Sequence, residues 1–373
     1  RCSAADRNGR GAAEASQGLS MRDLVKNLAA LLIGLAAAFI LAEIALSWLI
    51  PPPLHYIYPQ PTHQRDMELG WIMRPGQGTY TIDKPVRTNS FGFRSPEFDP
   101  HRSGKGLRVL CLGDSNTFGN GVSQDETYPA QLQMLLASRI PGAAAEAINA
   151  GIGGYGTTQE VDLLTRMAPL LSPDVVTIGF YLNDLGDAVR DNLEILDETG
   201  EEKRLGFKRF TPYRLIYLLK RSRLVTLVYW RFRLLRSGSE RDPLHQVLLG
   251  RTPPAYEESW RRIEDALSRA RDLARARGFR LIVFPVPTGQ EFLEDRLEEQ
   301  YRSRFITLAE RLGIEHFDPT PRMKALGGSF ERYFITWDGH INARTHRLIA
   351  ASLYEMLAPA IPEARAAGPE APR

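Results

Sequence analysis

A serine at the end of a predicted buried strand is the first candidate for chemistry in this sequence. The apolar run Val109–Leu112 ends in Gly113-Asp114-Ser115, and a polar turn punctuated by glycines follows. This pattern predicts a strand over 107–113 that stops at a sharp turn and presents the serine hydroxyl. Ligands of open α/β sheets bind at the carboxyl ends of the strands, where a serine becomes a nucleophile if a base and an oxyanion site converge on it. The position also fits a serine that only caps the following helix.

Three later segments place further polar groups at the ends of predicted elements. A glycine-rich turn follows Asn149, the pair Asn183-Asp184 ends an apolar run, and Asp338-Gly339-His340 lies near the carboxyl terminus. A serine hydroxyl is a weak nucleophile until a base removes its proton, and a histidine oriented by a carboxylate suits that role. The sequence therefore holds the residue types of an acyl-transfer site.

Taken in order, the four segments resemble the motifs of the SGNH (GDSL-type) hydrolases, over about residues 105–358. The resemblance implies Ser115 as nucleophile, His340 as base and Asp338 as the residue that orients the base. It also implies an oxyanion hole made of the backbone N–H groups of Ser115 and Gly154 and the side-chain amide of Asn183. Gly153 is the alternative to Gly154, which the register with Asn149 and Thr157 favours. It implies no metal and no organic cofactor.

The sequence departs from the family pattern at two places. Two residues usually separate the aspartate from the histidine, whereas only Gly339 separates them here. A Ser–His dyad supported by a backbone carbonyl therefore stays open beside the triad. Tyr181 stands where the family usually has a glycine, which would narrow the site or alter acyl selection.

Several polar residues near these motifs are expected to support the site without taking part in the chemistry. Asp114, Asn149 and Asp184 are expected to brace their loops by local hydrogen bonds. Structural or surface positions are expected for three further histidines: His245, His316 and His346.

Strands and helices alternate from residue 107 onward, which predicts a mostly parallel sheet with helices on both faces. The resemblance implies a flavodoxin-like three-layer α/β/α SGNH-hydrolase fold. The predicted strands are 107–113, 145–149, 174–181, 279–285 and 314–317. The predicted helices are 128–140, 157–169, 256–277, 290–312 and 342–357.

The apolar stretch 28–50 predicts an N-terminal transmembrane helix, because about 23 residues at ~1.5 Å each cross a ~30 Å hydrocarbon core. Arg22 and Lys26 precede it, so the positive-inside rule places the bulk of the protein outside the cytoplasm, on the periplasmic side. The rival interpretation is a cleaved signal peptide, which would need a shorter apolar region and a small-x-small cleavage site. Trp48 suits the membrane interface, and Glu43 fits a protonated, paired or headgroup-directed carboxyl.

The chain divides into successive segments. These are a polar segment 1–27 with the expected translation start at Met21, the transmembrane helix 28–50, a Pro-rich spacer and β-rich lead-in 51–105, the hydrolase domain 106–358 and a predicted disordered tail 359–373. The hydrolase domain contains a basic helical insertion at about 190–255.

The distribution of charge is more informative than the net charge of +3. Eleven Lys and Arg and no acidic residue fall within 203–236, among apolar residues at helical spacing. This insertion fits binding to anionic lipid headgroups, closure over the active site, or an ordinary solvated basic face. Nucleic acid is not an expected partner outside the cytoplasm. The chain has only two cysteines, Cys2 and Cys111, which excludes a disulfide framework and a zinc cluster of cysteines.

The leading hypothesis is a membrane-anchored serine esterase that hydrolyses an ester through an acyl-Ser115 intermediate, with O-acyl groups on cell-envelope glycans as the suggested substrate. A polysaccharide O-acyltransferase would use the same triad and pass the acyl group to a sugar hydroxyl. A catalytically silent anchored scaffold is the third hypothesis. The joint presence of Ser115, Asn183 and His340 argues against it.

Overall fold

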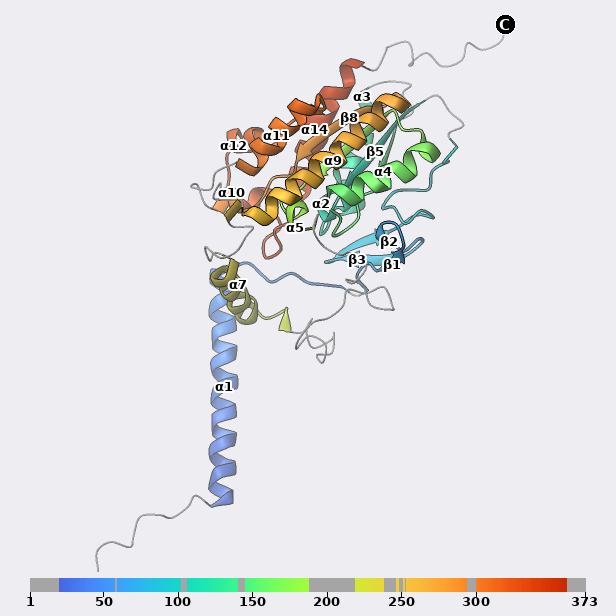
Figure 1. The fold of residues 1–373 in the computed structure, drawn as a ribbon. Helices are drawn as coiled ribbons and strands as arrows, with labels where there is room; N and C mark the ends of the chain where they lie inside the picture. Colours follow the sequence, from blue (N-terminus) through green and yellow to red (C-terminus); the bar gives the residue numbers. More distant parts are fainter. Residues whose placement is uncertain are drawn as a thin grey trace, which may run out of the picture.

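A five-stranded parallel sheet forms the centre of the molecule, with strand order β6-β5-β7-β8-β9 (Figure 1). The strands are β5 (Leu107–Gly113), β6 (Ala145–Asn149), β7 (Val175–Phe180), β8 (Arg280–Pro285) and β9 (Glu315–His316). The computed structural model describes residues 20–57, 59–101, 106–139, 145–187, 219–237, 246–247, 251, 253–293 and 300–360. The prediction of a flavodoxin-like, mostly parallel sheet is confirmed.

The order of the strands reverses around β5, because the chain first moves to β6 on one side and then crosses to β7 on the other. In open α/β sheets such a switch point opens a crevice at the carboxyl ends of the strands. The turn that carries Ser115 follows β5 directly, so the fold places it at this crevice.

Alternate residues of the strands face two separate helix layers, as the twofold period of a strand requires. Leu110 and Leu112 of β5 pack with α4 (Thr157–Leu171), α9 (Pro254–Arg277) and α11 (Gln300–Leu312). Val109 and Cys111 pack on the other face, with α3 (Tyr128–Arg139) and α14 (Ala343–Leu357). The apolar stripes of these helices bury both faces of the sheet, which is the three-layer arrangement.

The remaining short helices lie mostly in the connections. They are α2 (Ser115–Phe118), η1 (Gln124–Glu126), α5 (Asp184–Asp187), α10 (Gln290–Leu293), α12 (Thr320–Ala325), α13 (Phe330–Tyr333) and η4 (Ala358–Ala360). Within the range of the helix predicted at 290–312, the structure has α10 and α11, and residues 294–299 lie outside the described residues. A fully buried salt bridge of 2.8 Å from Arg302 Nε to Glu291 joins the two helices.

Two antiparallel hairpins precede the sheet, as the β-rich pattern predicted. They pair β1 (His63–Asp66) with β2 (Gly70–Met73) and β3 (Gly78–Thr81) with β4 (Lys84–Arg87). Arg94, which follows them, is buried and donates to the carbonyls of Phe118 (3.0 Å) and Val122 (2.7 Å). The lead-in therefore fixes the turn that follows α2.

A long apolar helix, α1 (Met21–Leu49), projects from the domain (Figure 1). It begins seven residues before the predicted span because Ser20 caps it by accepting from Asp23 N at 3.2 Å. The helix is long and apolar enough to cross a membrane, a property that an N-terminal signal sequence shares. Beside its carboxyl-terminal end, next to the domain, lies α7 (Arg223–Ser237), which belongs to the described part of the basic insertion. The rest of the predicted insertion lies mostly outside the described residues.

Candidate active site

The nucleophile turn joins β5 to α2. Asp114 is the N-cap of α2, and its carboxylate accepts from Asn116 N at 2.8 Å. The alternative in which Ser115 caps this helix is therefore wrong, because Asp114 satisfies the helix terminus. Ser115 is partly exposed while its neighbours on both sides are buried, so its hydroxyl is the reachable group of the turn.

His340 bridges the serine and an aspartate. Its Nε2 lies 2.8 Å from Ser115 Oγ, and its Nδ1 is hydrogen-bonded to the carboxylate of Asp338. The Asp338–Nδ1 bond favours the tautomer with the proton on Nδ1, which leaves Nε2 free to accept the serine proton. The structure thus brings together the three residues of the predicted triad, and the carboxylate occupies the place of the carbonyl in the dyad alternative.

The short Asp-x-His spacing still allows Asp338 to reach the His340 ring, because the loop between α13 and α14 turns tightly. Trp337 and Gly339 have φ of 67° and 97°, in the left-handed region. Gly339 N donates to Ile335 O at 3.0 Å, which closes the turn. The turn places Asp338 beside the imidazole although one residue fewer separates them than is usual in the family.

The pKa values of this pair are shifted in opposite directions. Burial alone would raise the pKa of Asp338, but the hydrogen bond and positive charge of His340 bring it below its usual range. Burial alone would lower the pKa of His340, but the bond to Asp338 and the negative charges of Asp338 and Asp114 raise it. The pair therefore favours an ionised aspartate beside a histidine that readily holds a proton.

The two other predicted oxyanion donors lie in turns beside Ser115. Gly154 follows β6 and has φ of 80°, a conformation that strains other residues. The carbonyl of Gly153 accepts from Trp71 Nε1 at 3.2 Å, and Ile152 N donates to Gly113 O at 3.0 Å. The first bond holds the Gly154 turn against β2, and the second holds it against the turn that carries Ser115. Asn183 follows β7, which is parallel to β5 and pairs with it. The turn of Asn183 therefore lies at the same carboxyl-terminal end of the sheet as Ser115.

The predicted bracing residues make hydrogen bonds that are local at Asn149, as expected, but that join segments 27 positions apart at Asp184. Asn149 accepts from Gly151 N at 3.1 Å, and Asp184 accepts from Thr157 Oγ1 at 2.7 Å. A Cβ on Gly151 would lie 2.3 Å from Phe118 N. The turn after β6 therefore packs against the backbone of α2 so closely that only glycine fits at position 151.

Two residues near the site escaped the sequence analysis. The side-chain nitrogen of Asn120 lies 3.3 Å from His340 Nδ1, and its oxygen is hydrogen-bonded to Thr81. Glu160 in α4 is fully buried, and neither of its carboxylate oxygens has a hydrogen-bond partner among the described residues. Burial and the charges of Asp184 and Asp114 raise its pKa well above the usual value. A glutamate in the first turn of an amphipathic helix gives no sequence signal of such burial.

Comparison with known proteins identifies the family. A sequence model of the "GDSL-like Lipase/Acylhydrolase family" matches residues 111–348, which include the nucleophile turn and the Asp–His loop. The chain belongs to this family. It is an SGNH-type ester hydrolase. The comparison with curated proteins found no relative.

Solved structures of other hydrolases are similar to this one at low identity. "TesA" is 16% identical, with 68% of this chain and 100% of that chain covered and a TM-score of 0.41. "LAE5, an alpha/beta hydrolase enzyme from the metagenome of Lake Arreo, Spain" is 16% identical, with coverage of 68% and 96% and a TM-score of 0.41. "AlinE4, a SGNH-hydrolase family esterase" is 17% identical, with coverage of 70% and 100% and a TM-score of 0.35.

Two of the three further histidines, His346 and His316, lie in structural positions. His346 of α14 is buried and accepts from Tyr128 N at 3.1 Å, and burial lowers its pKa to about 3. His316 lies on β9 with its Nδ1 3.0 Å from Ile314 O. His245 lies outside the described residues. Among the residues that the structure describes, no group of three or more His, Cys, Asp or Glu is placed to hold a metal ion.

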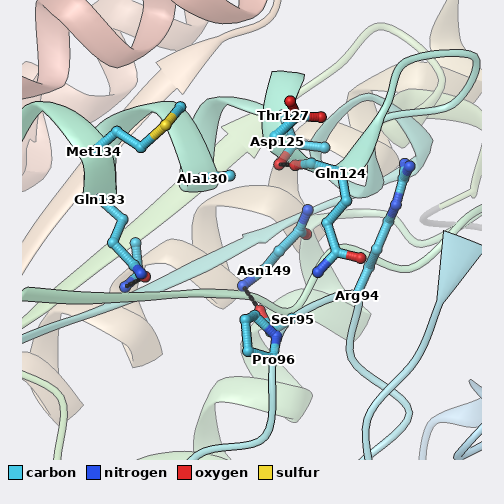
Figure 2. A pocket seen from close by; sticks show the side chains of 11 residues that line it. Arg94, Ser95, Pro96, Gln124, Asp125, Thr127, Ala130, Gln133, Met134 and Asn149 are labelled. Atoms are coloured by element: carbon cyan, nitrogen blue, oxygen red, sulfur yellow. Dashed lines mark hydrogen bonds between the residues drawn. The ribbon is translucent and has the colours of Figure 1, made fainter.

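A pocket of about 420 Å³ lies beside β6 and α3 (Figure 2). Figure 2 shows Arg94, Gln133 and Asn149 among the side chains around it. The described residues that line it do not include the triad. Since Arg94 and Asn149 are bound to the backbone of the nucleophile turn, the pocket lies behind that turn.

Proposed function

We propose that this hydrolase is a membrane-anchored serine esterase with Ser115 as nucleophile, His340 as general base and Asp338 as its orienting carboxylate. The observation that carries the proposal is the unbroken hydrogen-bonded series from the Asp338 carboxylate through both ring nitrogens of His340 to Ser115 Oγ. Each residue has the partner that its role requires.

The reaction has two steps. Ser115 Oγ attacks the ester carbonyl while His340 Nε2 takes the serine proton, and the alcohol then leaves with that proton, which forms acyl-Ser115. Water next attacks the acyl-enzyme, gives its proton to Nε2, and the carboxylic acid leaves as the proton returns to Ser115 Oγ. Asp338 stabilises the imidazolium present in both steps.

Negative charge develops on the carbonyl oxygen in both steps. We assign its stabilisation to the backbone N–H groups of Ser115 and Gly154 and to the amide of Asn183. Donors fixed before the reaction stabilise the transition state without reorganisation, and the loss of one costs about 2.7–4 kcal/mol of barrier. The positive φ of Gly154 and the Trp71 bond to Gly153 support a preorganised turn.

We place α1 across a membrane, with the catalytic domain on the extracytoplasmic side. The support is the 29-residue apolar helix and the basic residues Arg22 and Lys26 at its amino end. In that location we propose O-acyl groups on cell-envelope glycans as the substrate class. This assignment rests on the location and on the ester chemistry of the site.

The test uses the full chain in lipid nanodiscs with p-nitrophenyl acetate, with Ser115→Ala as the variant and Ser138→Ala on the exposed side of α3 as the matched control. We expect hydrolysis and reaction with a fluorophosphonate probe in the wild type and the control, and neither in Ser115→Ala. Release of acetate from an O-acetylated glycan then tests the substrate class.

Mass spectrometry of the same samples separates hydrolysis from transfer. An acyl-enzyme that accumulates until a sugar acceptor is added would replace the esterase proposal with an O-acyltransferase. A wild-type protein that reacts with no probe would overturn the triad assignment.

A further inference from the structure

The charged residue inside the apolar helix α1 is bound to the start of α7. The carboxylate of Glu43 accepts from the backbone N–H groups of Arg223 and Leu224, both at 3.0 Å, and from the hydroxyl of Ser222. A carboxylate at a helix amino terminus satisfies unpaired N–H groups and interacts favourably with the helix dipole. Glu43 therefore joins α7 to α1 at a defined height.

That height is close to the outer boundary of the hydrocarbon core. A ~30 Å core takes about 20 residues of helix, and 20 residues counted from Lys26 end near Leu46. Glu43 lies three residues before this point, which is within one helical turn of the boundary. The first turn of α7 therefore lies at the level of the lipid headgroups.

The outer face of α7 is apolar. Val228, Tyr229 and Phe232 are 59%, 55% and 57% exposed. At about 100° per residue, the three side chains fall within one ~100° arc of the helix. Such a cluster is unusual on a surface that faces only water.

Basic residues adjoin this apolar face on one side and just before the start of α7. Arg221 and Arg231 are exposed, and the sequence from 203 to 236 contains eleven Lys and Arg and no acidic residue. A helix with an apolar face, aromatic residues and adjoining basic residues is typical of helices that lie in the surface of an anionic bilayer.

The same helix contacts the catalytic loop. The rings of Trp230 and Trp337 lie 6.3 Å apart, and Trp337 Nε1 donates to Pro51 O at 3.3 Å, just beyond the end of α1. Trp337 immediately precedes Asp338. Whatever holds α7 in place thus also holds the loop that carries the catalytic aspartate and histidine.

We infer that α7 is an interfacial helix whose Val228–Tyr229–Phe232 face inserts into the outer headgroup region of the anionic bilayer that α1 spans. This contact holds the Asp338–His340 loop at the membrane surface, so that the enzyme acts on esters presented there. The inference rests on the membrane anchoring in the proposed function and adds a second, independent contact with the lipid.

The depth of α7 is measured with a fluorophore on a single introduced cysteine. The background is full-length Cys2→Ser, since Cys111 is buried, reconstituted in nanodiscs of phosphatidylglycerol and phosphatidylethanolamine. The label replaces Val228 in one sample. In the control the label replaces Met134, which is an apolar residue of α3 and is 49% exposed. A label at Leu35 in the middle of α1 reports the anchor itself.

We expect quenchers on the lipid acyl chains to reduce the emission at position 228, while aqueous iodide has little effect there. Position 134 should show the reverse. Nanodiscs of phosphatidylcholine alone should lower the lipid quenching at position 228, because the adjoining basic residues lose their counter-charge. Iodide quenching at 228 equal to that at 134 would overturn the inference, as would protection from both quenchers, which would mean that protein covers the face.

The readout separates this inference from the proposed function. Loss of lipid quenching at position 35 would overturn the membrane anchor. A wild-type Ser115 that fails to react with fluorophosphonate would overturn the esterase assignment and leave the depth of α7 unchanged. Water exposure at position 228 with an active Ser115 and a buried position 35 overturns the interfacial helix alone.

Discussion

Thr157 and Asp184 join the two turns that carry the proposed oxyanion donors. The Thr157 hydroxyl donates to the Asp184 carboxylate at 2.7 Å, and both side chains are fully buried. Thr157 begins α4 just after the Gly154 turn, and Asp184 directly follows Asn183. This buried bond therefore links the turns of two proposed donors that follow different strands.

Removal of this bond should weaken catalysis more than substrate binding. In Thr157→Val the side chain keeps its shape, but Asp184 loses a donor, which should cost about 1–3 kcal/mol of unfolding free energy. We expect kcat to fall by about 10- to 100-fold with a smaller change in KM, because misplacement of donors by a fraction of an ångström acts on the transition state. Steady-state kinetics and urea unfolding measure both effects. Thr157→Ser retains the hydroxyl and should stay near wild type, and an unchanged kcat in the valine variant would contradict the coupling.

The pH dependence of acylation should follow His340. The base must be neutral to accept the serine proton, and its pKa is raised above 6.5 by Asp338 and Asp114. The rate should therefore fall as the pH decreases through a value above 6.5. Rates of p-nitrophenyl acetate hydrolysis between pH 5 and 9 test this, and an acidic limb centred well below 6.5 would contradict the ion pair.

Asp338→Asn should change both the rate and the position of that limb. The amide no longer fixes the Nδ1–H tautomer, and the corresponding change in a serine protease lowers kcat by about 10⁴. Without the carboxylate, burial is left as the main influence and lowers the pKa of His340, so the acidic limb should move to lower pH. The pH–rate profiles of the variant and the wild type, measured side by side, test both expectations. A lower rate with an unmoved limb would mean that Asp338 acts only on loop structure.

The positions of Ser115, Gly154 and Asn183 along the chain were predictable because each one closely follows a strand with a clear apolar pattern. Strands β5 and β6 have the predicted bounds, since their apolar runs end at Gly113 and Asn149. Helix α4 also begins at the predicted residue, Thr157. The resemblance to a family added the pairing of Ser115 with His340, whose 225-residue separation no local pattern reveals.

What the sequence did not reveal depends on contacts between distant segments. The bond from Glu43 to α7 joins residues about 180 positions apart, so the sequence left three states open for that carboxyl. Asn120 contacts His340 across 220 positions. The burial of Glu160 and its proximity to the carboxylates of Asp114 and Asp184 arise only when the sheet brings these segments together.

The side chain of Asn183 should contribute to the transition state rather than to the fold. Asn183→Ala removes one proposed oxyanion donor, which should lower kcat by about 10²–10³-fold. Binding of substrate in the ground state depends less on this donor, so KM should change little. Stopped-flow measurement of the acylation burst isolates the step concerned, and an unchanged burst rate would remove Asn183 from the oxyanion hole.

Glu160 should make the protein less stable as the pH rises. Its pKa in the folded protein lies well above 4.5, so the native state keeps a proton that the unfolded chain releases. Between pH 4.5 and the folded pKa, the unfolding free energy should fall by up to about 1.4 kcal/mol per pH unit from this group. Glu160→Gln keeps the shape and removes the titration, so the stability of the variant relative to the wild type should increase from pH 4.5 to pH 7. Urea unfolding across this range measures the difference, with Glu258→Gln on the surface of α9 as the matched control. A constant difference between Glu160→Gln and the wild type would mean that Glu160 is ionised in the native state.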